Sequence, residues 1–231
     1  MQPKRVKKIL SLLMAVCLVF ALAPLAALAA EPPVTEQPIT PEAPVNPFTD
    51  VKETDWFIDA VIYVSNNGLM TGTSEDSTLF SPNDSVTRGM IAAILYRMEG
   101  DPDVSGIDNP FDDVAGGEWY TDAVIWAADK EIISGYGGGK FGPEDNMTRE
   151  QFAAILLNYE LYTDKIPRDI LMDRTFSDWS AISDWAKNAV NRLTIQGLIN
   201  GKPGNLFDPK GDVTRAETAA ILMRFLTAVE Q

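Results

Sequence analysis

Three Thr-Arg pairs carry the side chains in this sequence that are best suited to binding an anion. They are Thr87-Arg88, Thr148-Arg149 and Thr214-Arg215. The Thr suits the N-cap of a helix, where its hydroxyl accepts a backbone N–H of the first turn. The Arg does not, because the helix dipole disfavours a cation there by about 0.3 to 1 kcal/mol. We therefore expect each Arg either to form an internal ion pair or to bind a ligand anion through its guanidinium group.

Helix capping explains the other residues of two of these segments. Gln151 and Glu217 each stand three positions after the Thr, so the second and third segments fit the capping box. In the first segment Gly89 and Met90 follow the Arg, and neither can complete the box. We expect that helix to start less firmly.

Tryptophan and aspartate residues recur at similar distances before the Thr-Arg pairs. The tryptophans are Trp56, Trp119 and Trp185, and the aspartates are Asp50, Asp113 and Asp178. An aromatic residue at helical spacing is commonly a core residue, whereas one in a groove beside an Arg and an Asp would offer a face on which a sugar can stack. The aspartates are candidate partners for the Arg side chains, which they could orient for a ligand.

Composition argues against catalytic and metal-binding chemistry. The chain has no His, and its single Cys, Cys17, lies in an apolar N-terminal segment. Imidazole acid-base catalysis, nucleophile-His pairs and His metal sites are thereby excluded. Acidic loops such as Glu144-Asp145-Asn146 lack the ligand spacing of an EF-hand, which favours a solvated acidic surface over a calcium site. We predict no enzyme activity, catalytic residue, cofactor or metal.

The first 47 residues indicate export. Residues 1–30 combine a basic start with an apolar stretch that ends in small residues, which predicts a signal peptide; a retained membrane anchor is the alternative. Residues 31–47 are rich in proline and predict a semi-rigid spacer. The formal net charge of the whole chain is −14, and cleavage would remove basic residues only. Charge repulsion therefore argues against nucleic acids and, after cleavage, membranes as partners.

A repeated set of landmarks divides the rest of the chain into three copies. Each copy has Phe-x-Asp, a Trp, an Ala-Val pair, a glycine twelve residues after that Ala, a Phe-x-Pro loop, and the Thr-Arg pair five residues after the Pro. The glycines are Gly72, Gly135 and Gly201. We assign repeat 1 to residues 48–100, repeat 2 to 111–160 and repeat 3 to 176–231.

Each repeat is predicted to fold as helix, loop and helix. In repeat 1 the first helix is expected from Trp56 to Asn67, with Gly68 ending it. A unit this small cannot bury its apolar face alone, so the three must pack together. The pattern allows either closure around an approximate three-fold axis or stacking in a row.

The triplicated landmarks, which end in Thr214-Arg215-Ala216-Glu217 in repeat 3, resemble the S-layer homology repeat. The resemblance covers residues 48 to about 228. It implies a mainly α fold of three helix-loop-helix repeats packed around an approximate three-fold axis, with grooves between neighbouring repeats. It also implies non-covalent binding of a secondary cell-wall polysaccharide, typically one carrying an anionic, pyruvylated N-acetylmannosamine.

Position by position, the resemblance implies a ligand-binding Asp, Trp, Gly and Arg in each repeat. The residues are Asp50, Trp56, Gly72 and Arg88; Asp113, Trp119, Gly135 and Arg149; and Asp178, Trp185, Gly201 and Arg215. The copies are unequal: only repeat 3 has the full Thr-Arg-Ala-Glu, yet it replaces the Val after Asp178 with Trp179 and shifts Trp185 by one position.

The main hypothesis is thus a secreted cell-wall anchor that binds an anionic polysaccharide, with Arg pairing to its carboxylate. The alternative is a structural module that assembles with itself or with other surface proteins. An enzyme is the third hypothesis, and only the abundance of carboxylates suggests it.

Overall fold

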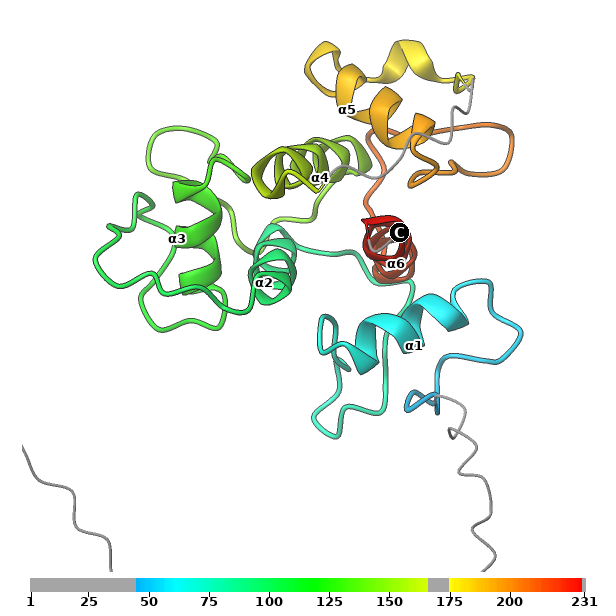
Figure 1. The fold of residues 1–231 in the computed structure, drawn as a ribbon, viewed down its shortest axis with the longest axis horizontal. Coiled ribbons are helices and arrows are strands. Elements are labelled where there is room, and N and C mark those ends of the chain that lie inside the picture. Colours follow the sequence, from blue (N-terminus) through cyan, green and yellow to red (C-terminus); the bar gives the residue numbers. More distant parts are fainter. Residues whose placement is uncertain (1–44, 166–174, 230–231) are drawn as a thin grey trace, which may run out of the picture. The chain divides into compact units, whose positions relative to one another are not determined.

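The computed structural model describes residues 45–165 and 175–229, so the predicted signal peptide and most of the predicted spacer lie outside the described residues. Within these ranges the chain is mainly helical and forms no strand (Figure 1). The helices are α1 (Ile58–Asn66), α2 (Arg88–Met98), α3 (Thr121–Asp129), α4 (Arg149–Thr163), the 3-10 helix η1 (Trp179–Ala181), α5 (Asp184–Ile195) and α6 (Arg215–Val229).

Each repeat contributes two α-helices, as predicted. The first helix of repeat 1 begins two residues later than expected, because the Ile58 N–H closes a turn onto the Asp55 carbonyl before the helix starts. The second helices begin after the predicted Thr residues. Thr148 and Gln151 form a complete capping box, and Thr214 and Glu217 exchange the same two hydrogen bonds.

The first segment is capped on one side only. The Thr87 hydroxyl accepts the Met90 N–H at 3.3 Å. Close packing explains why residue 89 is glycine. A Cβ there would lie 3.0 Å from the Pro143 carbonyl oxygen and 3.3 Å from the Tyr120 ring.

The helices of neighbouring repeats pack on one another in a closed cycle. The second helix of each repeat packs on the first helix of the next, giving the pairs α2 with α3, α4 with α5, and α6 with α1. A row of repeats would leave α1 and α6 apart at its two ends. The contact between them therefore excludes the row and agrees with the cyclic arrangement that the resemblance implies.

Three backbone hydrogen bonds join the residues that precede the Thr-Arg pairs. Val86 donates to Val213, Val213 donates to Met147, and Met147 donates to Val86, at distances of 3.0, 2.9 and 2.9 Å. All three side chains are fully buried. This ring of hydrogen bonds fixes the starts of α2, α4 and α6 relative to one another.

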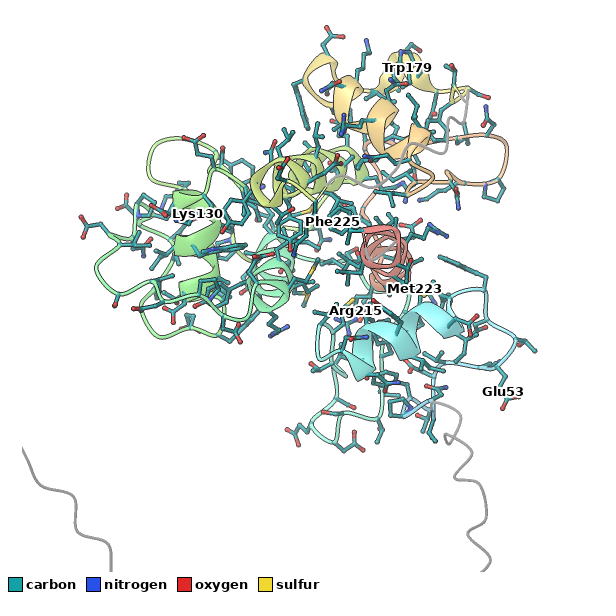
Figure 2. All side chains as sticks on the ribbon, viewed as in Figure 1. Glu53, Lys130, Trp179, Arg215, Met223 and Phe225 are labelled. Atoms are coloured by element: carbon teal, nitrogen blue, oxygen red, sulfur yellow. The ribbon has the colours of Figure 1, made fainter. Side chains whose placement is uncertain are left out.

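The buried core is continuous through the three repeats, and its main helix contacts join each second helix to the first helix of the next repeat. Each second helix carries two adjacent alanines, small residues that allow a neighbouring helix to pack closely: Ala92 and Ala93, Ala153 and Ala154, and Ala219 and Ala220. Toward the C-terminal ends of α4 and α6, the ring centroids of Tyr159 and Phe225 lie 5.8 Å apart. Phe225 is labelled in Figure 2. In the part of the chain described, no helix is long and apolar enough to cross a membrane.

An aspartate holds each Phe-x-Pro turn. Asp113 accepts the N–H groups of Phe141 at 2.9 Å and Gly142 at 3.0 Å. Asp50 and Asp178 bind the equivalent pairs in repeats 1 and 3. The middle residue of each turn has a positive φ, between 54° and 70°, and only in repeat 2 is it glycine. The two hydrogen bonds stabilise this left-handed conformation where a side chain disfavours it.

We expect Asp113→Ala to lower the free energy of unfolding by about 2 to 3 kcal/mol, because two backbone donors lose a charged acceptor. Asp112→Ala is the matched control, since Asp112 is the exposed neighbour in the sequence and its carboxylate does not bind the N–H groups of Phe141 and Gly142. Denaturant titration compares the two variants. Equal stability of both would contradict this role for Asp113.

The same carboxylate should make stability depend on pH. Burial raises the pKa of Asp113, but the Phe141 and Gly142 N–H groups lower it further, so that the pKa lies below its ordinary value. Its contribution is therefore complete above about pH 4 and is lost as the pH falls through the folded-state pKa. The unfolding free energy of the wild type should fall more steeply on acidification than that of Asp113→Asn. Parallel curves would argue against it.

Candidate functional site

Three grooves of similar size lie on the described part of the chain, with volumes of about 500, 390 and 480 Å³. We name them the Gly72, Gly135 and Gly201 grooves after the predicted loop glycine that lines each one. These volumes lie in the range of small-ligand sites.

All three repeats contribute to each groove. The glycine and one wall of the second helix come from one repeat, the Arg comes from the preceding repeat, and the Trp comes from the following repeat, in cyclic order. The resulting sets are Gly72, Arg215 and Trp119; Gly135, Arg88 and Trp185; and Gly201, Arg149 and Trp56. The predicted Arg, Trp and Gly residues thus meet, but never within a single repeat.

The Arg side chains tie neighbouring repeats together. Arg215, which is labelled in Figure 2, belongs to repeat 3. It donates from Nε to the Phe80 carbonyl at 2.7 Å and from Nη2 to the Thr71 carbonyl at 2.6 Å. Its guanidinium carbon also lies 4.6 Å from the centroid of the Phe80 ring. Arg88 makes the corresponding contacts with Phe141 and Ser134.

Arg149 departs from this pattern. Its Nε donates to the Phe207 carbonyl at 2.7 Å, as expected from the other repeats, but its Nη1 pairs with Glu217 at 3.0 Å. Lys202 lies close by, with Nζ 3.8 Å from the same Glu217 oxygen and 2.7 Å from Asp208.

The alternative in which the Arg side chains form ion pairs with Asp50, Asp113 and Asp178 is wrong. Among the described residues these carboxylates bind backbone N–H groups of the Phe-x-Pro turns, and none forms an ion pair with an Arg. The two side chains instead act on the same Phe. The Asp accepts its N–H, and the Arg of the preceding repeat binds its carbonyl. The aspartates do not line the three grooves.

Burial dominates the electrostatics of two groove arginines. Arg88 is 4% and Arg215 6% exposed. Removal from water lowers the pKa of both, although Asp113 and Asp145 near Arg88, and Asp50 and Asp84 near Arg215, act in the opposite direction. Both groups remain cationic at neutral pH, since a guanidinium group ordinarily loses its proton only in strong base.

The interpretation of the tryptophans as core residues is wrong. Trp56 is 66%, Trp119 55% and Trp185 59% exposed. Trp56 and Trp119 rest edge-on against the buried rings of Phe57 and Tyr120, at centroid distances of 5.3 and 5.0 Å. These contacts fix the indoles at the groove edge while leaving much of each ring free.

The loop glycines are required by close approach of the returning chain. A Cβ at Gly72 would lie 2.6 Å from the Ser77 carbonyl oxygen, and one at Gly135 would lie 2.5 Å from that of Lys140. At Gly201 the carbonyl of Leu206 would be 2.8 Å away. A side chain at any of these positions would displace the loop that brings the glycine to its groove.

One set of groove residues was missed from the sequence. Arg97, Asn158 and Arg224 stand at equivalent positions of α2, α4 and α6, and each donates to a backbone carbonyl of the loop after the first helix. All three line their grooves. Their spacing could have predicted this position. Each lies seven residues, or about two helical turns, after Met90, Gln151 or Glu217, and therefore on the same face of the helix.

The described residues contain no group of three or more acidic or sulfur-bearing side chains arranged to hold a metal ion.

Comparison with known proteins identifies the repeated unit. The S-layer homology domain matches residues 47–89, 110–153 and 175–219. An amylopullulanase of Thermoanaerobacterium thermosulfurigenes is 36% identical over 78% of this chain and 9% of its own length. An exoglucanase of Acetivibrio thermocellus is 34% identical over 78% of the chain and 16% of its own length.

A third relative is a cellulosome-anchoring protein of Acetivibrio thermocellus. It is 27% identical over 64% of the chain and 33% of its own length. The similarity thus spans at most a third of these three relatives. The matched domain and the relatives confirm the predicted location at the cell surface. The chain belongs to the S-layer homology domain family.

Proposed function

We propose that this chain anchors to the cell wall by binding an anionic, pyruvylated secondary cell-wall polysaccharide in its grooves. The observation that carries the proposal is the repeated meeting of an exposed Trp with a buried Arg, brought together from different repeats in each groove. The similarity to a cellulosome-anchoring protein supports the anchoring role.

The contacts give the Trp, Arg and Asp side chains different roles in binding. The indole face offers apolar area on which a sugar ring can stack. The guanidinium group offers its remaining N–H donors to a carboxylate, and such charge-assisted bonds are stronger than neutral ones. The Asp side chains act indirectly in this scheme, because they hold the turn whose Phe carbonyl positions the Arg.

Substitution of the tryptophans tests the site with little effect on the fold, since all three are more than half exposed. We expect each of Trp56→Ala, Trp119→Ala and Trp185→Ala to weaken binding in its own groove by roughly 2- to 12-fold, and the triple variant to lose binding to purified cell walls. Sedimentation of protein with washed walls measures the binding.

Leu161→Ala is the matched control, because Leu161 is an apolar side chain with 61% exposure that lines none of the three grooves. It should sediment as the wild type does. A triple tryptophan variant that folds normally and still binds walls would exclude the grooves as the binding sites.

Removal of the pyruvyl groups tests the carboxylate. Walls stripped of pyruvate should bind the chain at least tenfold more weakly than untreated walls, because the Arg side chains lose their anionic partner. Equal binding to both preparations would rule out the carboxylate mechanism while leaving a neutral sugar site open.

A further inference from the structure

The start of α5 differs from the starts of α1 and α3, although all three helix starts carry a groove tryptophan. α1 and α3 begin two residues after their tryptophans, and each of these indoles rests on the buried ring of the next residue. α5 begins one residue before Trp185, so this tryptophan lies in the first helical turn. Trp185 is followed by Ala186, which has no ring to support the indole.

The first turn of α5 is not capped by its own residues. Ser183 is the N-cap residue, but its side chain accepts no N–H group of the first turn. In a capping box, a Glu or Gln at the third helical position accepts the N–H of the N-cap residue. Ala186 occupies that position in α5 and has no side-chain acceptor. The Ser183 N–H therefore needs an acceptor from elsewhere.

Glu150, the second residue of α4, supplies this acceptor from the preceding repeat. One of its carboxylate oxygens accepts the Ser183 N–H at 2.9 Å, and the other accepts the Ser183 hydroxyl at 3.0 Å. A carboxylate near a helix N-terminus is also favoured by the helix dipole. The bond that a capping box makes within one helix is thus made here between α4 and α5, which pack on each other.

Lys210 balances the charge of this carboxylate, whose side chain is only 4% exposed. The Lys210 ammonium group pairs with Glu150 and also donates to the Ser183 hydroxyl at 2.6 Å. A buried carboxylate needs such a partner, because burial of an unpaired charge is costly. Glu150, Ser183 and Lys210 therefore form one polar cluster that joins α4 to the start of α5.

The equivalent positions of the other second helices have no acceptor side chain. They are occupied by Gly89 in α2 and Ala216 in α6. A Cβ at Gly89 would lie 3.3 Å from the ring of Tyr120, which supports Trp119. Between α4 and α5 a carboxylate thus stands where the contact between α2 and α3 has an aromatic ring.

Taking the proposed function as its basis, we propose that Glu150 is a positioning residue for the Gly135 groove. By completing the cap of α5, it fixes the helical turn that carries Trp185 and holds the indole at the groove edge, where a sugar ring would stack. Glu150 does not itself line the groove, so it acts only through Trp185.

Fluorine NMR of the full chain labelled with 5-fluorotryptophan provides the readout. Trp185 reports on the Gly135 groove, and Trp119 reports on the Gly72 groove, where the support is Tyr120. The buried Trp126 reports on the fold. Titration with synthetic pyruvylated N-acetylmannosamine gives the affinity of each groove.

We expect Glu150→Ala to shift the Trp185 resonance of the unliganded protein, because the first turn of α5 loses its cap. Sugar binding at Trp185 should weaken by roughly three- to tenfold, within the range expected for loss of the indole itself. Affinity at Trp119 should change less than about twofold, because its supporting ring is unaltered.

Glu150→Gln is the conservative variant. Its amide can accept the Ser183 N–H and donate to the Ser183 hydroxyl, while Lys210, with 59% side-chain exposure, turns to water. Trp185 should therefore keep its resonance and its affinity to within about twofold. Glu144→Ala is the matched control, since it removes an exposed carboxylate from the same repeat and should change neither quantity.

A Glu150→Ala variant that is less stable to denaturant but keeps the wild-type resonance and affinity at Trp185 would overturn this inference and leave the proposed function intact. Equal losses from Glu150→Ala and Glu150→Gln would overturn it as well. If no groove tryptophan of the wild type responds to the sugar, the proposed function fails. A Trp185 resonance that moves in unliganded Glu150→Ala but not in Glu150→Gln would still support the positioning role of Glu150.

Discussion

The structure depends on the way each Phe-x-Pro turn is held from two repeats at once. The Asp of its own repeat binds the Phe N–H, and the Arg of the preceding repeat binds the Phe carbonyl and packs on its ring, as Asp50 and Arg215 do at Phe80. The turn is thereby locked in a left-handed conformation and joined to the neighbouring helix. Since this occurs in cyclic order three times, no repeat can reach its native contacts alone.

This arrangement gives the repeated Arg and Trp residues different roles. Each groove Arg already donates hydrogen bonds to backbone carbonyls of the neighbouring repeat. Its substitution would therefore disturb the junction between repeats as well as the groove. The exposed tryptophans are the cleaner probes of binding. The same constraint makes the grooves composite, because the Arg and Trp that flank a ligand belong to repeats on either side of the one that supplies the glycine.

Copies of one motif then become unequal through single positions. Met90, Gln151 and Glu217 share a place on the helix, yet only two of them complete a capping box and only one carries charge. Similarly, Asn158 replaces an Arg at the position of Arg97 and Arg224 and still reaches the equivalent carbonyl. Variation is tolerated where backbone contacts are kept, which allows the grooves to differ in charge without loss of the fold.

The three repeats, the two helices in each and the Thr caps could be predicted from the residues alone, because they follow from local spacing and helix-capping chemistry. The same repeated landmarks pointed to the family. It also nominated Arg, Trp and Gly residues that do line the grooves. The folded chain was needed to show which residues share a groove and that the tryptophans are exposed. It also showed that the groove residue Arg149 pairs with Glu217, whereas Asp113 and its equivalents bind backbone N–H groups. These contacts join residues of different repeats. The spacing of residues within one repeat does not indicate which helix of another repeat will pack against it.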